Sequence, residues 1–192
     1  MSLLSQSTVS NKISLSGVGI HTGKTVNVNI LPSSPNSGII FKRIDLKNNN
    51  IVIPNFENVS EATLCTTISN QYGVKVSTIE HLMAAFLGLG IDNAVVELDS
   101  QEVPILDGSA KNFVKIIKET GLKNSDVPIK LIKINNSVQI EEDQKFISIE
   151  KSNTTLEIEF EINYENKLIN NQKNKINVFE DKLDDIFNSR TF

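Results

Sequence analysis

The chain of 192 residues contains one cysteine, two histidines and no tryptophan. The single cysteine, Cys65, excludes an internal disulfide and favours a reducing compartment. No hydrophobic run approaches the length of a membrane span, and the first residues lack the layout of a secretion signal. The sequence therefore predicts a cytoplasmic protein without an integral membrane segment.

Neither sign of charge dominates, since 19 basic and 23 acidic side chains give a formal net charge of -4. Nucleic-acid binding usually needs a basic face, so this balance argues against a nucleic-acid partner. With 39% hydrophobic and 22% charged residues, the composition is typical of a globular protein. The length allows one domain or two small ones with a real core.

A short helix is predicted within residues 77–92, where apolar residues recur at the spacing of one buried helix face. These residues are Ile79, Leu82, Met83 and Phe86. Gly88 is predicted to end the helix. His81 is predicted on the opposite face, where the small side chains of Ala84 and Ala85 leave room for another backbone or a ligand.

The spacing leaves two interpretations open for each of the two polar residues at the start of this helix. Ser77 and Glu80 are three residues apart, as in a capping box, so Glu80 is either a helix cap or a catalytic base. His81 is either a hydrogen-bonded packing residue or a metal ligand.

The glycine-rich segment 17–24 resembles a phosphate-binding loop, but Val18 stands where that motif needs glycine. Alternating apolar residues follow from Val26 to Ile30 and predict a strand, not the helix that a phosphate loop precedes. We therefore expect a hairpin turn that contains His21. The imidazole of His21 either lies on the surface without a specific role or faces a ligand. A phosphate-binding module at this turn is the weaker alternative.

The remaining elements of the first half predict an α+β domain, in which a mixed sheet carries two helices on one side. Further strands are expected at 39–44, 63–68, 74–76 and 94–98. A second helix is expected to bury Phe113, Val114, Ile116 and Ile117 and to end at Gly121.

The second half predicts an incomplete α+β domain of similar type. Residues 121–128 are expected to form a linker. Strands are then expected at 129–134, 138–140, 146–149 and 156–162, followed by a loop at 166–175. A last helix is marked by Phe179, Leu183, Ile186 and Phe187. The predicted domains are 1–122 and 127–192, the second lacking a helix to cover its sheet.

Six segments along the chain resemble motifs of one enzyme family, in the family's order. They are GVGIHTG at 17–23, TLCT at 63–66, STIEHLMAA at 77–85, GLGIDN at 88–93, EVPILDGS at 102–109 and RTF at 190–192. The family is that of the UDP-3-O-acyl-N-acetylglucosamine deacetylases, the zinc amidases of lipid A biosynthesis. The resemblance implies two sheet-and-helix domains with the active site between them.

By this resemblance, His81 would be a zinc ligand and Glu80 the general base that takes a proton from the attacking water. Zinc would lower the pKa of that water and polarise the acetamide carbonyl. Thr191 would stabilise the oxyanion. The residues expected to line the site for an acylated UDP-sugar are Leu64, Cys65 and Phe192.

The chain departs from the family's pattern in its ligands. A second histidine and an aspartate are expected beyond Phe192, whereas His21 and His81 are the only histidines here. A catalytic zinc site normally needs three protein ligands. The leading hypothesis is therefore an N-terminal part that is inactive alone and needs the missing C-terminal half, in cis or in trans. The alternative is a noncatalytic binding module or remnant that holds a nucleotide-sugar lipid or a partner half.

Overall fold

The computed structural model describes residues 4–152, 156–178 and 180–191. The chain divides into two compact units. Unit 1 combines residues 1–129 with 184–192, and unit 2 comprises residues 130–183. Each unit is described by itself.

Unit 1 is built around a five-stranded sheet of order β2-β3-β9-β4-β5. Its strands are β2 (Ile13–Val18), β3 (Thr25–Pro32), β4 (Ile39–Arg43), β5 (Ile51–Val52) and β9 (Ala94–Leu98). The β4–β9 pair is parallel and the other pairs are antiparallel, so the sheet is mixed. Val26, Val28 and Ile30 alternate along β3 and are buried, as the sequence pattern predicts.

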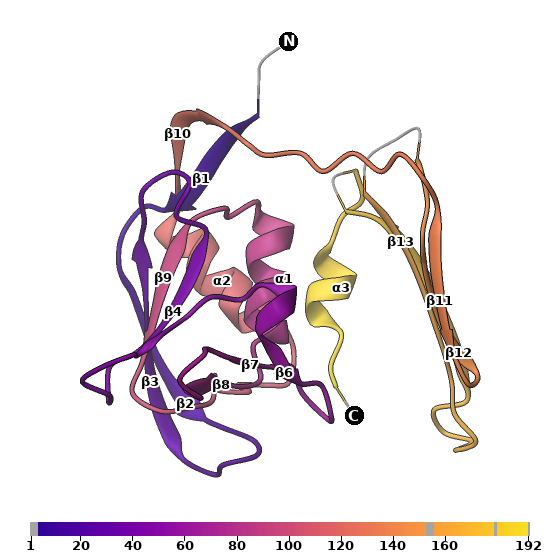
Figure 1. Ribbon diagram of the computed structural model, residues 1–192, viewed down its shortest axis with the longest axis horizontal. Coiled ribbons are helices and arrows are strands. Elements are labelled where there is room, and N and C mark those ends of the chain that lie inside the picture. The colour runs from indigo at the N-terminus through magenta and orange to yellow at the C-terminus, as the bar shows by residue number, and fades with distance from the viewer. Residues whose placement is uncertain (1–3, 153–155, 179, 192) are drawn as a thin grey trace. The chain divides into compact units, whose positions relative to one another are not determined.

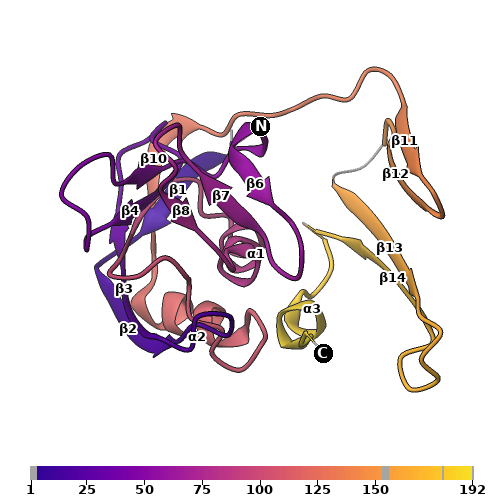
Figure 2. The same ribbon diagram turned by 60° about the horizontal axis from the view of Figure 1, so that its bottom comes forward.

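Two helices, α1 (Glu80–Leu89) and α2 (Lys111–Thr120), lie on the same side of this sheet (Figures 1 and 2). Leu82 and Phe86 of α1 and Phe113 and Ile117 of α2 are fully buried. This arrangement confirms the predicted α+β fold class, because the helices cover the apolar face of a sheet.

The end of α1 differs from the prediction. Gly88 lies inside the helix, and Gly90 ends it with a left-handed φ of 68° and an amide bonded to the carbonyls of Leu87 and Phe86. A glycine accepts this backbone conformation without a steric cost. The glycine that ends the helix is thus the one with positive φ, and α1 is one turn longer at this end than its apolar stripe.

A smaller sheet of order β6-β7-β8 precedes α1. It consists of β6 (Val59–Glu61), β7 (Thr67–Ser69) and β8 (Lys75–Val76), and a short 3-10 helix, η1 (Phe56–Asn58), leads into it. The strand predicted at 63–68 begins only at Thr67. Residues 63–66 are therefore a loop that approaches the start of α1.

The prediction of a linker at residues 121–128 is wrong. Residues Leu122–Pro128 form β10, which pairs antiparallel with β1 (Ser5–Val9). The two strands are more than a hundred residues apart in sequence, so no local pattern could reveal the pairing. The strand predicted directly afterwards, at 129–134, is also wrong, because these residues have no regular structure.

The last helix, α3 (Asp184–Asn188), belongs to unit 1 and buries Phe187. It begins after Leu183, and the predicted contribution of Phe179 lies outside the described residues. None of the helices in the described parts of the chain is long and apolar enough to span a membrane.

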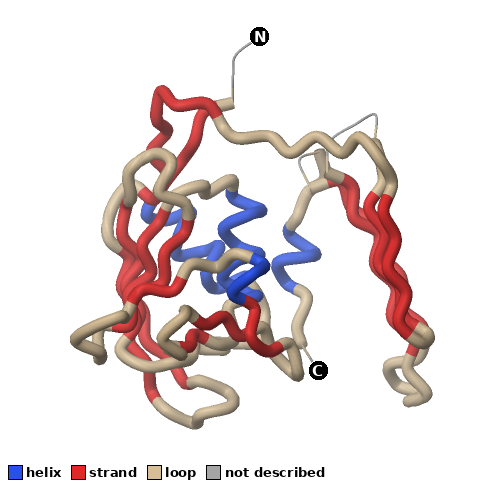
Figure 3. The backbone as a smooth tube through the Cα atoms, viewed as in Figure 1, coloured by secondary structure: helices blue, strands red, loops and turns tan. Residues whose placement is uncertain are grey.

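The described residues of unit 2 form strands and loops (Figure 3). One hairpin pairs β11 (Val138–Glu142) with β12 (Lys145–Ile149), and the other pairs β13 (Glu157–Asn163) with β14 (Asn171–Asn177). The loop predicted at 166–175 is therefore too long. Lys173 lies 2.6 Å from Glu159, and Lys175 lies 2.8 Å from Glu157, across this second hairpin.

Candidate active site

Glu80 begins α1 but does not act as its cap. The residue before the helix is Ile79, with no capping side chain, and the Ser77 hydroxyl donates to the carbonyl of Gln101 instead. The Glu80 carboxylate accepts a hydrogen bond of 3.2 Å from the backbone amide of Thr66. The capping interpretation is thus wrong, and Glu80 connects α1 to the loop at 63–66.

His81 follows Glu80 and is half-buried. The open face expected around it is narrower than predicted, because Ala85 is fully buried in the core. Ala84 is exposed and Gly88 is half-buried, so small residues do flank the imidazole on the outer side of the helix. His81 therefore lies at the margin between the buried and exposed faces, where a side chain can reach a ligand while its helix packs.

The loop at 63–66 carries two predicted substrate-lining residues. Leu64 has 88% of its surface exposed and a left-handed φ of 62°. Cys65 is half-buried, with its Sγ 3.7 Å from Oγ1 of Thr67. A large apolar side chain held outward on a positive-φ residue is uncommon and costs free energy. The loop that carries these two residues is joined to Glu80 through the amide of Thr66.

Thr191 is tied to a different loop of unit 1. Its backbone amide donates to the carbonyl of Gly108 at 3.0 Å, and Arg190 forms an exposed ion pair with Asp107 at 3.4 Å. Hydrogen bonds from the hydroxyl and the backbone amide of Ser109, and then the nearby Arg190 charge, lower the pKa of Asp107. Among the described residues, no hydrogen bond joins Thr191 to Glu80 or His81, and Phe192 lies outside them.

Glu102 is a residue of this region that the sequence did not single out. Its side chain is completely buried, and its carboxylate accepts hydrogen bonds from the amides of His21 and Thr22 at 3.0 and 2.8 Å and from the Thr78 hydroxyl at 3.1 Å. Burial raises the pKa of Glu102, but these hydrogen bonds outweigh it and lower the pKa below its ordinary value. The sequence signals are its place as the first residue of the motif at 102–109 and an acidic residue directly before the apolar run that starts at Val103.

The described residues do not form a complete metal site. No group of three histidine, cysteine, aspartate or glutamate side chains lies close enough together in residues 4–152, 156–178 and 180–191. A catalytic zinc ion needs three protein ligands and an open position for water. His81 can supply one ligand, so the residues present do not fit a zinc ion without further donors.

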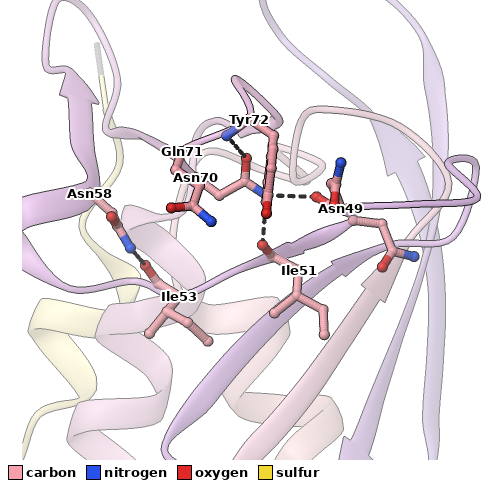
Figure 4. Close-up of a pocket in the computed structure, with 8 residues that line it drawn as sticks. Asn49, Ile51, Ile53, Asn58, Asn70, Gln71 and Tyr72 are labelled. Atoms are coloured by element: carbon pink, nitrogen blue, oxygen red, sulfur yellow. Dashed lines mark hydrogen bonds between the residues drawn. The ribbon is translucent and has the colours of Figure 1, made fainter.

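A separate open pocket of about 400 Å³ lies near β5 and the turn between β7 and β8 (Figure 4). It is lined by Asn49, Asn50, Ile51, Ile53, Asn58, Asn70, Gln71 and Tyr72, and it contains none of the predicted site residues. The amide of Asn70 donates to the carbonyls of Asn49 and Ile51, so this side chain shapes the pocket wall.

The family follows from comparison of the whole sequence. Residues 6–192 match the profile of the family described as LpxC, UDP-3-O-acyl N-acetylglycosamine deacetylase. The chain belongs to this family. The match runs from β1 to the end of the chain and so includes every motif segment on which the predicted site depends.

Relatives within the deacetylase family are named UDP-3-O-acyl-N-acetylglucosamine deacetylase. One from Shewanella baltica is 37% identical over 193 residues, which cover 99% of this chain and 63% of the relative. One from Shewanella oneidensis is 36% identical over 193 residues, which also cover 99% of this chain and 63% of the relative. A third, from Shewanella sp. strain W3-18-1, is 42% identical over 147 residues, covering 77% of this chain and 48% of the relative. The chain thus spans less than two thirds of the length of these relatives.

Proposed function

We propose that this chain is part of an enzyme that hydrolyses the N-acetyl group of UDP-3-O-acyl-N-acetylglucosamine in lipid A biosynthesis. The observation that carries the proposal is the family match over residues 6–192. The proposed substrate is a UDP-sugar with an acyl chain, and the proposed location is the cytoplasm, which the single cysteine favours. The proposal divides the chain into a first domain, 1–122, and the first part of a second, 127–192.

In this proposal Glu80 is the general base that removes a proton from the attacking water. Its position supports the role, because the carboxylate is half-buried and one of its oxygens is held by the amide of Thr66. The other oxygen has no hydrogen bond to a described residue that would oppose proton transfer. Thr191 stabilises the developing oxyanion, and Leu64, Cys65 and Phe192 line the substrate site.

The proposed cofactor is Zn²⁺, with His81 as one protein ligand. Since the described residues supply no set of three ligands, the others are proposed to come from sequence outside these 192 residues, in cis or in trans. The chain by itself is then expected to bind zinc weakly and not to turn over. The greater length of the relatives supports this division of the ligands between two parts.

The decisive experiment measures zinc content and deacetylation for the chain alone and for the chain supplied with the remaining third of a relative. We expect one zinc ion and turnover only in the second case. There, Glu80→Gln should lower kcat by about 10²- to 10⁴-fold while metal stays bound, and His81→Ala should lose the metal. Glu119→Gln, an exposed carboxylate on α2, is the matched control and should change neither.

Zinc binding and turnover by the 192-residue chain alone would show that the ligand assignment is wrong. A second candidate function, a noncatalytic binding module, is favoured by the single histidine available at α1. It would replace the first if the completed chain binds the acylated UDP-sugar but does not deacetylate it.

A further inference from the structure

Three segments of unit 1 meet at the buried carboxylate of Glu102. Oε1 accepts from the His21 amide and from the Thr78 hydroxyl, and Oε2 accepts from the Thr22 amide. Thr22 lies in the turn between β2 and β3, and Thr78 lies just before α1. One side chain from the loop after β9 therefore holds together a hairpin turn and the segment that leads into the Glu80–His81 helix.

The backbone around Glu102 is held as tightly as its side chain. The Ser77 amide donates to the carbonyl of Gln101 at 2.8 Å, and the Val103 amide donates to the carbonyl of Ser77 at 3.0 Å. These bonds form a parallel bridge between Ser77 and Glu102. In addition, a Cβ atom at Gly19 would clash with the Glu102 carboxylate, so the turn can approach this closely only because residue 19 is glycine.

Thr78 adopts a backbone conformation that needs outside support. It is buried and has a φ of 57°, in the left-handed region that β-branched residues rarely enter. Such strain persists only where surrounding contacts fix it. The hydroxyl bond to Glu102 is a contact of this kind. The reversal at Thr78 sets the direction in which the chain enters α1, two residues before Glu80.

We propose that Glu102 is a positioning residue for Glu80 and His81. It acts through Thr78, whose strained conformation it holds, and it touches neither residue itself. The inference deepens the proposed function and rests on it for its catalytic meaning. The positioning can nevertheless be measured without turnover, because His21 and His81 are the only histidines of the chain and give two sets of imidazole NMR signals.

The first test compares imidazole and backbone amide spectra of the 192-residue chain with those of variants. Glu102→Gln and Thr78→Val should shift the His81 ring signals and the Thr66 amide. The first replaces one of the two acceptor oxygens with an NH₂ donor that faces other donors, which disturbs the bonds that hold Thr78, and the second removes the Thr78 hydroxyl. Thr78→Ser keeps the hydroxyl and should retain the wild-type spectrum. The spectrum of His21→Gln shows which imidazole signals belong to His21 and which to His81. Glu97→Gln, at the surface pair with Lys42, is the matched control and should leave His81 unshifted.

Folded Glu102→Gln and Thr78→Val variants with unshifted His81 and Thr66 signals would overturn the proposal. If Glu102→Gln does not fold, the Thr78→Val and Thr78→Ser pair still decides it, since these variants differ in one hydroxyl. We expect shifted signals in Thr78→Val and unshifted signals in Thr78→Ser. Equal spectra for the two variants would count against positioning through Thr78.

The second test measures deacetylation by the chain supplied with the remaining sequence of the enzyme. Glu102→Gln should lower kcat about tenfold or more at unchanged KM, because misplaced catalytic groups affect the chemical step more than substrate binding. A raised KM at unchanged kcat would contradict the positioning role. If the wild-type assembly shows no deacetylation, the proposed function fails, while the NMR comparison still decides the positioning.

Discussion

Glu102 shows how a single ionised residue can depend on its surroundings. Its side chain is fully buried, yet hydrogen bonds from backbone amides and hydroxyls hold its pKa below the ordinary value of 4.5, against the effect of burial. Because folding lowers this pKa, the charged carboxylate stabilises the fold above pH 4.5. That stabilisation is lost as the pH falls through the folded-state pKa.

We therefore expect the urea midpoint of the chain to fall between about pH 6 and pH 3, and to fall less steeply in Glu102→Gln. Asp45 and Asp107 should retain part of the slope, because a hydrogen bond from Arg43 and one from Ser109, respectively, lower their pKa values. Urea unfolding at a series of pH values checks this. Equal slopes in the two proteins would show that Glu102 is not charged and hydrogen-bonded as described.

Glycine is required at position 19 because other side chains approach its Cα closely, and not because of its backbone φ. A methyl group there would clash with the carboxylate of Glu102 and with Oγ1 of Thr22. Gly19→Ala should cost about 1–3 kcal/mol of unfolding free energy by overpacking. Gly23→Ala is the matched control, since it has open space but a φ of 65°, and should cost about 1 kcal/mol. Denaturant titration measures both, and a smaller cost at position 19 than at 23 would contradict the packing.

At the scale of the element, α1 joins a fully buried face to a polar start. Leu82 is completely buried, whereas Leu87 on the same helix is 49% exposed. Leu82→Ala should therefore destabilise the chain by about 2–5 kcal/mol, through lost burial and a residual cavity. Leu87→Ala should change stability by less than about 0.5 kcal/mol. Thermal or urea unfolding of the two variants tests whether α1 packs as described.

Two elements show what local patterns miss at this scale. The polar residues of β10 predict a linker, yet they pair with β1, which is more than a hundred residues away in the sequence. The Asn- and Lys-rich residues of β14 read as a loop, yet Lys173 and Lys175 face glutamates of β13. A polar segment forms a strand when a distant segment of the chain pairs with its backbone. The periodicity of the polar segment's own sequence does not indicate that partner.

At the scale of the whole molecule, unit 2 exposes the apolar face of its first hairpin. Val138 pairs with Ile149 and Ile140 with Ile147, so these four side chains share one face. All four are about half exposed or more, from 49% to 69%. Exposed apolar patches of this kind favour association or coverage by another segment.

We expect the isolated chain to associate at high concentration and to bind a hydrophobic dye. Ile140→Thr together with Ile147→Thr should reduce both effects, because it removes the centre of the apolar face. Gln139→Thr with Ser148→Thr changes the opposite face of the same hairpin and is the matched control. Sedimentation and dye fluorescence test this, and equal association of both double variants would mean that another surface drives it.

The sequence by itself determined the local part of this protein and its family. Helical spacing predicted α1 and α2, strand alternation predicted β3, and a mostly apolar run predicted β9. Six motif segments predicted the deacetylase family to which the chain belongs. These features depend on neighbouring residues or on whole-chain similarity. The roles of Glu80, His81 and Thr191 stay predictions.

Only the tertiary structure decided which side chains meet. It showed that Glu80 bonds to Thr66 and not to Ser77, and that Thr191 is held at Gly108. It also showed that three motifs converge on the buried carboxylate of Glu102. Such contacts join residues far apart in the chain and depend on burial and on hydrogen bonds made only after folding. Residue spacing along the sequence carries no record of them.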